Sequence, residues 1–370
     1  MNSWARRVQI LLSLSTFLFC TIPARAILFE ATSNTAFNTT APTGALTNNG
    51  WQYEGQWNTD QGTFTGTPIA PTFFLAAQHI GGSSGQPFVF NGFTYTTVTN
   101  FDDPSTDLRI WQVAQTFPYY APLYTQTNEV SKLCVAIGRG FDRGNAVIVG
   151  GKTNGWQWGL TPFVQRWGEN IISQIYNSPP LNGDHLLAVF DRNGIANECM
   201  LTTYDSSGGM FIEDGTTWKI AGVHHAVSNP FVSTNGVNGS GFNAALVDYG
   251  GLYIGGDGNW TLVTNETSDI PGYFISTRVS VRVSWINSVI NFTPGPDLRI
   301  TNIAPAGADI HISLSTGSNR LYLIQKTSDL VTGTWTTVSS NVSGNGGIVT
   351  IVDTNAAAQP KRFYRAQLLQ

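Results

Sequence analysis

Charged side chains are scarce in this chain, at 11% of 370 residues, and there are only 3 cysteines and 3 methionines. Soluble proteins average about 25% charged residues. The 19 basic residues face 23 acidic ones, for a net charge of −4, which excludes a nucleic-acid binder with a basic face. The near absence of Glu/Lys pairs also excludes long solvent-exposed helices, which use such pairs on their surface.

The residues that are present favour a mostly β chain. A hydrophobic content of 41% is too high for disorder, and 39 glycines punctuate the sequence. Short apolar or alternating segments recur between turn-forming residues, at a spacing typical of barrels and sandwiches. These segments include residues 88–90, 93–98, 108–113, 146–149, 186–190 and 218–223. The clearest helical spacing lies at 279–290.

Residues 1–26 have the pattern of a signal peptide. Arg6 and Arg7 precede an apolar run at 8–22, and small residues follow at 24–26. Fifteen apolar residues are short for a membrane span, which needs about 20. We therefore expect export, to the periplasm or the exterior, and no later run is long enough to span a bilayer.

Two cysteines remain after residue 26, Cys134 and Cys199. In an exported chain such a pair is read as one disulfide. The alternative is two buried thiols, since free cysteine is among the most buried residue types.

A Pro/Gly-rich break at 291–296 predicts a domain boundary. We expect a main domain at 27–292, a linker at 293–296 and a small β-sandwich of five or six strands at 297–370. The last segment carries no catalytic cluster. It resembles, loosely, the accessory modules of some secreted bacterial proteins, so surface or matrix attachment, substrate binding and plain stabilisation all remain open.

Three stretches contain the residue types of nucleophilic catalysis. His79 ends an apolar strand, Asp107 opens another, and Ser206 lies in a glycine-rich turn. The order His, Asp, Ser is one known for catalytic triads. A serine hydroxyl needs an imidazole to remove its proton, and the imidazole needs a carboxylate to fix its tautomer. The spacing of the three stretches predicts such a triad.

With these stretches the chain resembles a trypsin-like (chymotrypsin-fold) serine protease of a secreted bacterial type. The matching segments, in order, are Leu75–His79, Asp107–Leu108, Asp205–Gly209, 218–223 and 271–286. The resemblance implies an all-β fold of two six-stranded barrels with a C-terminal helix. It further implies hydrolysis of proteins or peptides through an acyl-enzyme without a cofactor, with His79 as base, Asp107 orienting it and Ser206 as nucleophile.

Two residues depart from the family pattern around the nucleophile. Tyr204 replaces the oxyanion-hole glycine, and Ser207 replaces the glycine after the serine. In this register the N–H groups of Tyr204 and Ser206 form the oxyanion hole. A register shifted by one residue makes Ser207 the nucleophile and places Asp205, which tolerates positive φ better, at the first position. We favour Ser206, because that register keeps the Asp-Ser pair.

The adjacent histidines His224 and His225 lie on the strand expected to line the substrate cleft. Because strand side chains alternate, one of them can face the pocket. Some family members that cut after Glu carry a histidine on this strand, so an acidic preference is one hypothesis, and a hydrogen-bonded wall residue is the other. An adjacent pair cannot chelate one metal from one face, and we predict no metal site. The aromatic stretch at 154–159 either faces the substrate or packs on the second barrel.

Three further alternatives stay open. In the family, a freed N-terminus pairs with the Asp before the nucleophile, and cleavage after residue 26 would free Ile27 for Asp205. The irregular turn at Tyr204 and Ser207 also fits an inactive, protease-like binding module. A working triad, finally, can hydrolyse esters rather than peptides.

Overall fold

The computed structural model describes residues 27–160, 163–177, 183–234, 239–256, 258–290, 298–317, 320–331, 333–359 and 361–369. The expected signal peptide at 1–26 and the linker at 293–296 lie outside the described residues, so both stay predictions.

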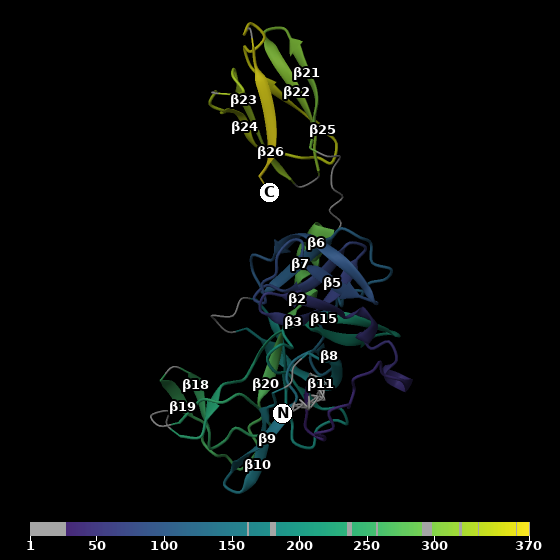
Figure 1. Ribbon diagram of the computed structural model, residues 1–370, viewed down its shortest axis with the longest axis vertical. Coiled ribbons are helices and arrows are strands. Elements are labelled where there is room, and N and C mark those ends of the chain that lie inside the picture. Colours follow the sequence, from purple (N-terminus) through teal and green to yellow (C-terminus); the bar gives the residue numbers. More distant parts are fainter. Residues whose placement is uncertain are drawn as a thin grey trace, which may run out of the picture.

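The first of two closed barrels is built from strands that follow one another in sequence (Figure 1). These strands are β2 (Gly55–Thr59), β3 (Gly62–Ala70), β4 (Phe73–Ala77), β5 (Pro87–Phe90), β6 (Phe93–Asp102) and β7 (Leu108–Val113). Aromatic side chains fill its centre, where the rings of Phe74 and Phe88 stack 4.0 Å apart and Trp57 lies 5.3 Å from Trp111. Large rings remove much apolar surface from water per residue, which lets short strands build a core.

The second barrel closes in the order β11-β12-β20-β15-β14-β8. Its strands are β8 (Leu133–Gly138), β11 (Arg166–Tyr176), β12 (His185–Val189), β14 (Gly209–Asp214), β15 (Thr217–Val227) and β20 (Tyr273–Arg278). The two six-stranded barrels confirm the predicted chymotrypsin-like architecture.

Smaller sheets flank the second barrel. They comprise β9 (Arg143–Val149), β10 (Lys152–Trp158) and β17 (Ala244–Leu246); β16 (Phe231–Val232), β18 (Tyr253–Gly256) and β19 (Asn259–Leu262); and the pair β1 (Leu28–Phe29) with β13 (Cys199–Met200). Short 3-10 turns occur at Gly44–Leu46, Trp51–Tyr53 and Ser280–Arg282.

The predicted disulfide between Cys134 and Cys199 is wrong, because both thiols are free and fully buried. Cys134 lies on β8 and its sulfur is 3.3 Å from the Asn170 carbonyl oxygen, with which it forms a hydrogen bond. Cys199 lies on a different strand, β13. Burial raises the pKa of both thiols, so each behaves as a small apolar core residue.

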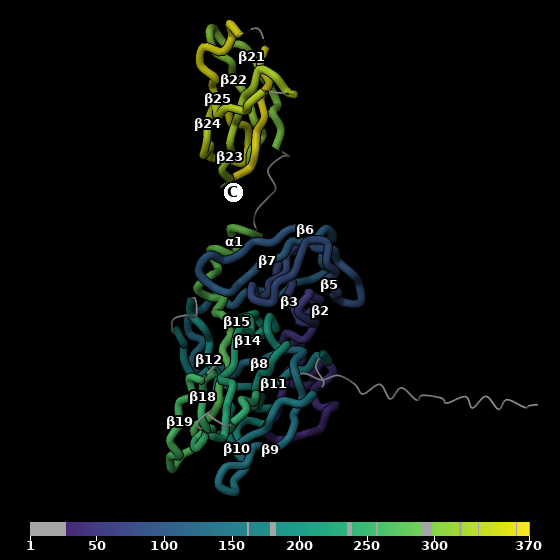
Figure 2. The backbone as a smooth tube through the Cα atoms, turned by 60° about the vertical axis from the view of Figure 1, so that its left-hand side comes forward, coloured from purple at the N-terminus to yellow at the C-terminus, as the bar shows by residue number. Residues whose placement is uncertain are grey.

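The predicted helix is shorter at its start than its sequence pattern indicates. Helix α1 spans Val283–Ile290 (Figure 2). Its residues Ile286 and Val289 are buried. Val279, just after β20, donates its N–H to the Ala221 carbonyl, and a 3-10 turn at Ser280–Arg282 precedes the helix. Among the described residues, no helix is long and apolar enough to cross a membrane.

Residues 300–368 form the expected small sandwich from two three-stranded sheets. One holds β21 (Ile300–Ala306), β22 (Asp309–Ser315) and β25 (Ile348–Asp353), the other β24 (Thr336–Ser343), β23 (Leu321–Thr327) and β26 (Phe363–Leu368). Both sheets contribute to a core of its own, which includes Ile312, Leu314, Tyr322, Ile324 and Val342.

A buried ion pair joins the segment before β8 to the end of β20. Arg278 donates two hydrogen bonds of 2.8 Å to the two carboxylate oxygens of Glu129, whose side chain is fully buried. Ser280 donates a third hydrogen bond to the same carboxylate. Removing the Glu129 charge leaves Arg278 buried with only a longer contact, 3.5 Å to the carboxylate of Asp184.

We therefore expect Glu129→Gln to lower the free energy of unfolding by about 3–5 kcal/mol in urea denaturation. Asp214→Asn is the matched control, because it breaks the partly exposed pair with Lys219 and should cost about 1 kcal/mol or less. Equal losses in the two variants would contradict a special role of the buried pair.

Candidate active site

Strand pairing in the first barrel brings His79 and Asp107 together. β4 ends at Ala77 and β7 begins at Leu108, and these two residues are partners in the ladder. The residues just beyond both strand ends therefore meet, and Gln78 donates its N–H to the Asp107 carbonyl at 2.6 Å. Ser206 comes from the second barrel, in the turn before β14.

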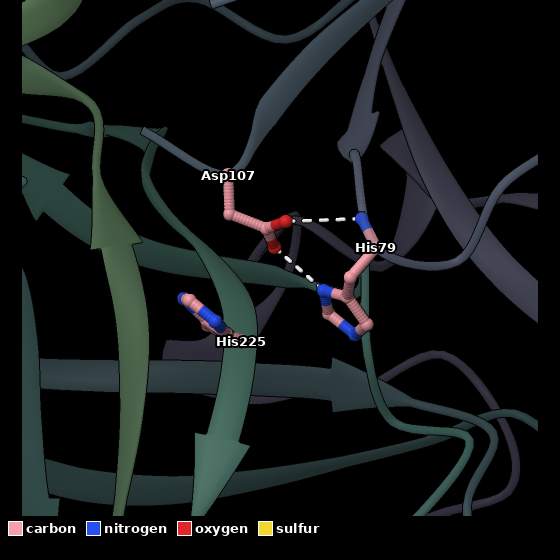
Figure 3. A group of neighbouring side chains, drawn as sticks. All are labelled: His79, Asp107 and His225. Atoms are coloured by element: carbon pink, nitrogen blue, oxygen red, sulfur yellow. Dashed lines mark hydrogen bonds and ion pairs between the residues drawn. The ribbon is translucent and has the colours of Figure 1, made fainter. Parts of the chain in front are cut away.

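The three predicted side chains form a continuous hydrogen-bonded line. Nδ1 of His79 lies 2.6 Å from Oδ2 of Asp107, and Nε2 of His79 lies 2.9 Å from Oγ of Ser206. Asp107 also accepts the His79 backbone N–H at 3.0 Å, which fixes the backbone beside the imidazole (Figure 3). A carboxylate at Nδ1 favours the tautomer with its proton there, so Nε2 is free to accept the serine proton.

Ser207, the nucleophile of the shifted register, faces away from this line. It is fully buried, and its Oγ accepts the Ala77 N–H at 3.1 Å. Its own N–H donates to the His224 carbonyl at 2.9 Å. The structure thus places Ser206, and not Ser207, against His79.

Tyr204 keeps a left-handed backbone, with φ of 73°, although it is not glycine. Such a conformation costs of order 1–3 kcal/mol and persists only where its surroundings enforce it. The Tyr204 ring packs against three phenylalanines, 4.9 Å from Phe163, 5.4 Å from Phe141 and 5.8 Å from Phe64. This aromatic contact explains how a tyrosine holds a left-handed conformation that glycine adopts freely.

The carboxylate of Asp205 is held by main-chain and hydroxyl donors. Gly140 donates its N–H at 2.6 Å, and Thr202 donates both its N–H at 2.8 Å and its hydroxyl at 3.0 Å. Burial raises the pKa of Asp205 to about 7. Ile27 is buried, and its carbonyl accepts a hydrogen bond from Arg166. The Ile27–Asp205 pairing of a processed N-terminus stays a prediction.

A cavity of about 180 Å³ opens beside Ser206. Its lining includes Trp158, Thr202, Thr203, His224, His225 and Asn229. Among the described residues that line it, none is lysine or arginine. Nδ1 of His224 lies 2.8 Å from the Ser276 hydroxyl, and burial lowers the pKa of His224 to about 3, so this imidazole is neutral at pH 7.

His185 was not singled out from the sequence, yet it lies directly behind the site. β12 and β15 pair with opposite edges of β20. His185 lies opposite Thr277 and His224 lies opposite the adjacent Ser276, so the histidines of the two strands come close together. Nε2 of His185 lies 2.8 Å from Nδ1 of His225, whose ring stacks 5.4 Å from that of His79. Burial lowers the pKa of His225 to about 4. Only the barrel register, and no local motif, reveals this contact.

Glu54 is a second residue that the sequence did not reveal. It is buried beside Gly209, at the end of the turn that holds Ser206, where a Cβ on Gly209 would approach its Oε1 to 2.4 Å. The Thr67 hydroxyl donates to Oε1 at 2.7 Å, and burial raises the pKa of Glu54 to about 7.

Comparison with known proteins gives similarity of fold only. No family model and no curated protein sequence matches the chain. One similar solved structure is neuropsin, a serine protease of mouse brain, with 12% sequence identity over 71% of this chain and all of that one and a TM-score of 0.41. Kallikrein-related peptidase 10 has 13% identity over 68% of this chain and 98% of that one, with a TM-score of 0.36. An inactive mutant form of Rv3671c from M. tuberculosis has 14% identity over 68% of this chain and 96% of that one, with a TM-score of 0.37.

The protonation of Glu54 predicts a pH-dependent effect of Glu54→Gln, which keeps an acceptor for Thr67. The native pKa of about 7 exceeds the ordinary value of 4.5, so this group stabilises the fold fully below pH 4.5 and loses that contribution as the pH rises to 7. As the pH rises from 4.5 to 7.5, the free energy of unfolding of the glutamine variant should therefore increase relative to that of the wild type, by on the order of 3 kcal/mol in urea denaturation. A stability difference that stays constant with pH would contradict this protonation.

Proposed function

We propose that this protein is an exported serine endopeptidase. The single observation that carries the proposal is the hydrogen-bonded line from Asp107 through His79 to Ser206, with distances of 2.6 and 2.9 Å. The neighbouring cavity supplies a place for the side chain before the cleaved bond.

Each triad residue has one chemical task. Ser206 Oγ attacks the peptide carbonyl carbon while its proton moves to Nε2 of His79. The proton then passes to the leaving amine as the C–N bond breaks, which leaves an acyl-enzyme. Water repeats these steps with the same base and releases the acid. Asp107 stays ionised throughout and stabilises the imidazolium.

The N–H groups of Tyr204 and Ser206 are proposed to bind the oxyanion. Within the part of the chain that the structure describes, neither group has another acceptor. Donors already oriented for the developing charge are worth about 3–4 kcal/mol each. The left-handed Tyr204, held by its phenylalanine neighbours, is the residue that orients one of them.

Two rival functions use the same fold. The positive φ values at Tyr204 and Ser207, of 73° and 70°, motivate an inactive binding module. A triad that hydrolyses esters is the other rival, and parallel assays of peptide and ester substrates separate it. The segment 297–370, with its own core, is proposed as an accessory domain for a surface, a matrix or the substrate.

A fluorophosphonate probe tests the nucleophile directly. We expect it to label the wild type and to fail on Ser206→Ala. Ser207→Gly is the matched control: it suits the φ of 70° and keeps the Ser206 hydroxyl, but it removes the hydroxyl that accepts the Ala77 N–H, so labelling should persist at a reduced rate. Correctly folded wild type that takes no label favours the inactive module, and label lost only in the Ser207 variant would restore the shifted register.

The pocket hypothesis predicts preference through hydrogen bonds rather than charge. A neutral His224 and Thr203 can each donate to a side-chain oxygen, but the described residues that line the cavity include no lysine or arginine. In a peptide library that varies the residue before the cleaved bond, we expect kcat/KM for Glu and Gln to lie within about tenfold of each other. Both should exceed Leu, Phe and Arg by more than tenfold, about 1.4 kcal/mol. Equal rates for polar and apolar residues would end the hypothesis.

A further inference from the structure

Three ligand-type side chains converge beside the proposed nucleophile. Single donor atoms of His79, Asp107 and His225 all lie within 4.8 Å of one another. They come from three separate elements, the end of β4, the start of β7 and strand β15 (Figure 3). The side chain of His79 is 38% exposed and that of Asp107 is 11% exposed, so a small ion from solvent can reach them.

A fourth residue holds His225 in place. Nδ1 of His225 is engaged with Nε2 of the fully buried His185, at 2.8 Å. The nitrogen left over on His225 is Nε2. Metal-binding imidazoles characteristically use one ring nitrogen as the ligand and the other in such an orienting hydrogen bond. His224 takes no part, because it is not among the described residues whose donor atoms converge at this place.

We propose that His79, Asp107 and His225 form a site for Zn²⁺ or a similar divalent transition ion, which inhibits the enzyme reversibly. Two imidazoles and a carboxylate, with a fourth position open to water, are a ligand set that zinc commonly takes. The inhibitory part rests on the proposed function, whereas the binding part does not.

The required movement is small. Zinc bonds of about 2.0–2.1 Å place tetrahedral ligands about 3.3 Å apart. Nδ1 of His79 and Oδ2 of Asp107, at 2.6 Å, must separate slightly, and His225 must approach both, since one of its ring nitrogens lies within 4.8 Å of a donor atom of each. The rings of His79 and His225 are 22° from parallel with centroids 5.4 Å apart, so the exposed His79 must also turn to aim Nδ1 at the ion.

The ion would inhibit by changing the tautomer of His79. In the triad the proton sits on Nδ1, facing Asp107, and Nε2 accepts from Ser206. When zinc bonds to Nδ1, that proton leaves for solvent and another is taken up at Nε2, with no net change in the number of protons bound. The base for Ser206 is then lost, while the serine itself is untouched.

Zinc binding is measured first, by titration calorimetry at pH 7.5 on the full chain carrying Ser206→Ala, so that the result does not depend on activity. We expect one site, weakened at least tenfold by adding His225→Gln. His311→Gln, on β22 of the sandwich, is the matched control and should bind as before. Co²⁺ in place of zinc should give the visible spectrum of a tetrahedral ion, and His225→Gln should abolish it.

The outcomes separate the two proposals. No binding at 1 mM zinc (roughly −4 kcal/mol), or binding indifferent to His225→Gln, overturns the metal site. If His225→Gln does not fold, Asp107→Asn replaces it with the same expectation. Binding without hydrolysis by the wild type retains the site and rejects the proposed peptidase. If the wild type does hydrolyse peptides, zinc should lower the rate of hydrolysis and EDTA should restore it. A rate that bound zinc leaves unchanged overturns the inhibitory role.

Discussion

The site depends on one hydrogen bond between the two barrels, from the Ala77 N–H to the Ser207 hydroxyl. It joins the last residue of β4 to the turn that holds Ser206, before β14 of the second barrel. Ser207 is fully buried, and its N–H is tied in turn to the His224 carbonyl. A buried polar group without its partner is costly, so the turn has little freedom to move away. Ser206, one residue earlier, is therefore held beside His79.

Close packing of the backbone reinforces this arrangement. A Cβ on Gly208 would lie 2.0 Å from the Ile137 carbonyl oxygen, so only glycine lets the turn approach β8 so closely. At Tyr204 a large side chain occupies a position where glycine would fit more easily. Its ring contacts stabilise a left-handed backbone conformation that glycine adopts freely. Residues 204 to 208 thus combine strain, burial and close approach around one serine.

Histidines are few in this chain, and most of them meet at one place. Four of the five lie in or behind the cleft, on β12, on β15 and beyond β4. Burial lowers the pKa of His185, His224 and His225, and so keeps these three neutral at pH 7. Neutral imidazoles can hydrogen-bond a substrate or bind a metal ion without adding charge beside Asp107.

The amino-acid sequence by itself determined the β architecture, the position of the helix to within a few residues, and the three stretches that hold His79, Asp107 and Ser206. These are local signals: alternation, turn residues and short motifs. Only the tertiary structure placed Ser206 rather than Ser207 beside His79, left Cys134 and Cys199 as free thiols, and brought His185 and Glu54 to the site. Barrel closure sets these contacts between residues far apart in the chain, and no local pattern records the register in which strands so distant will pair.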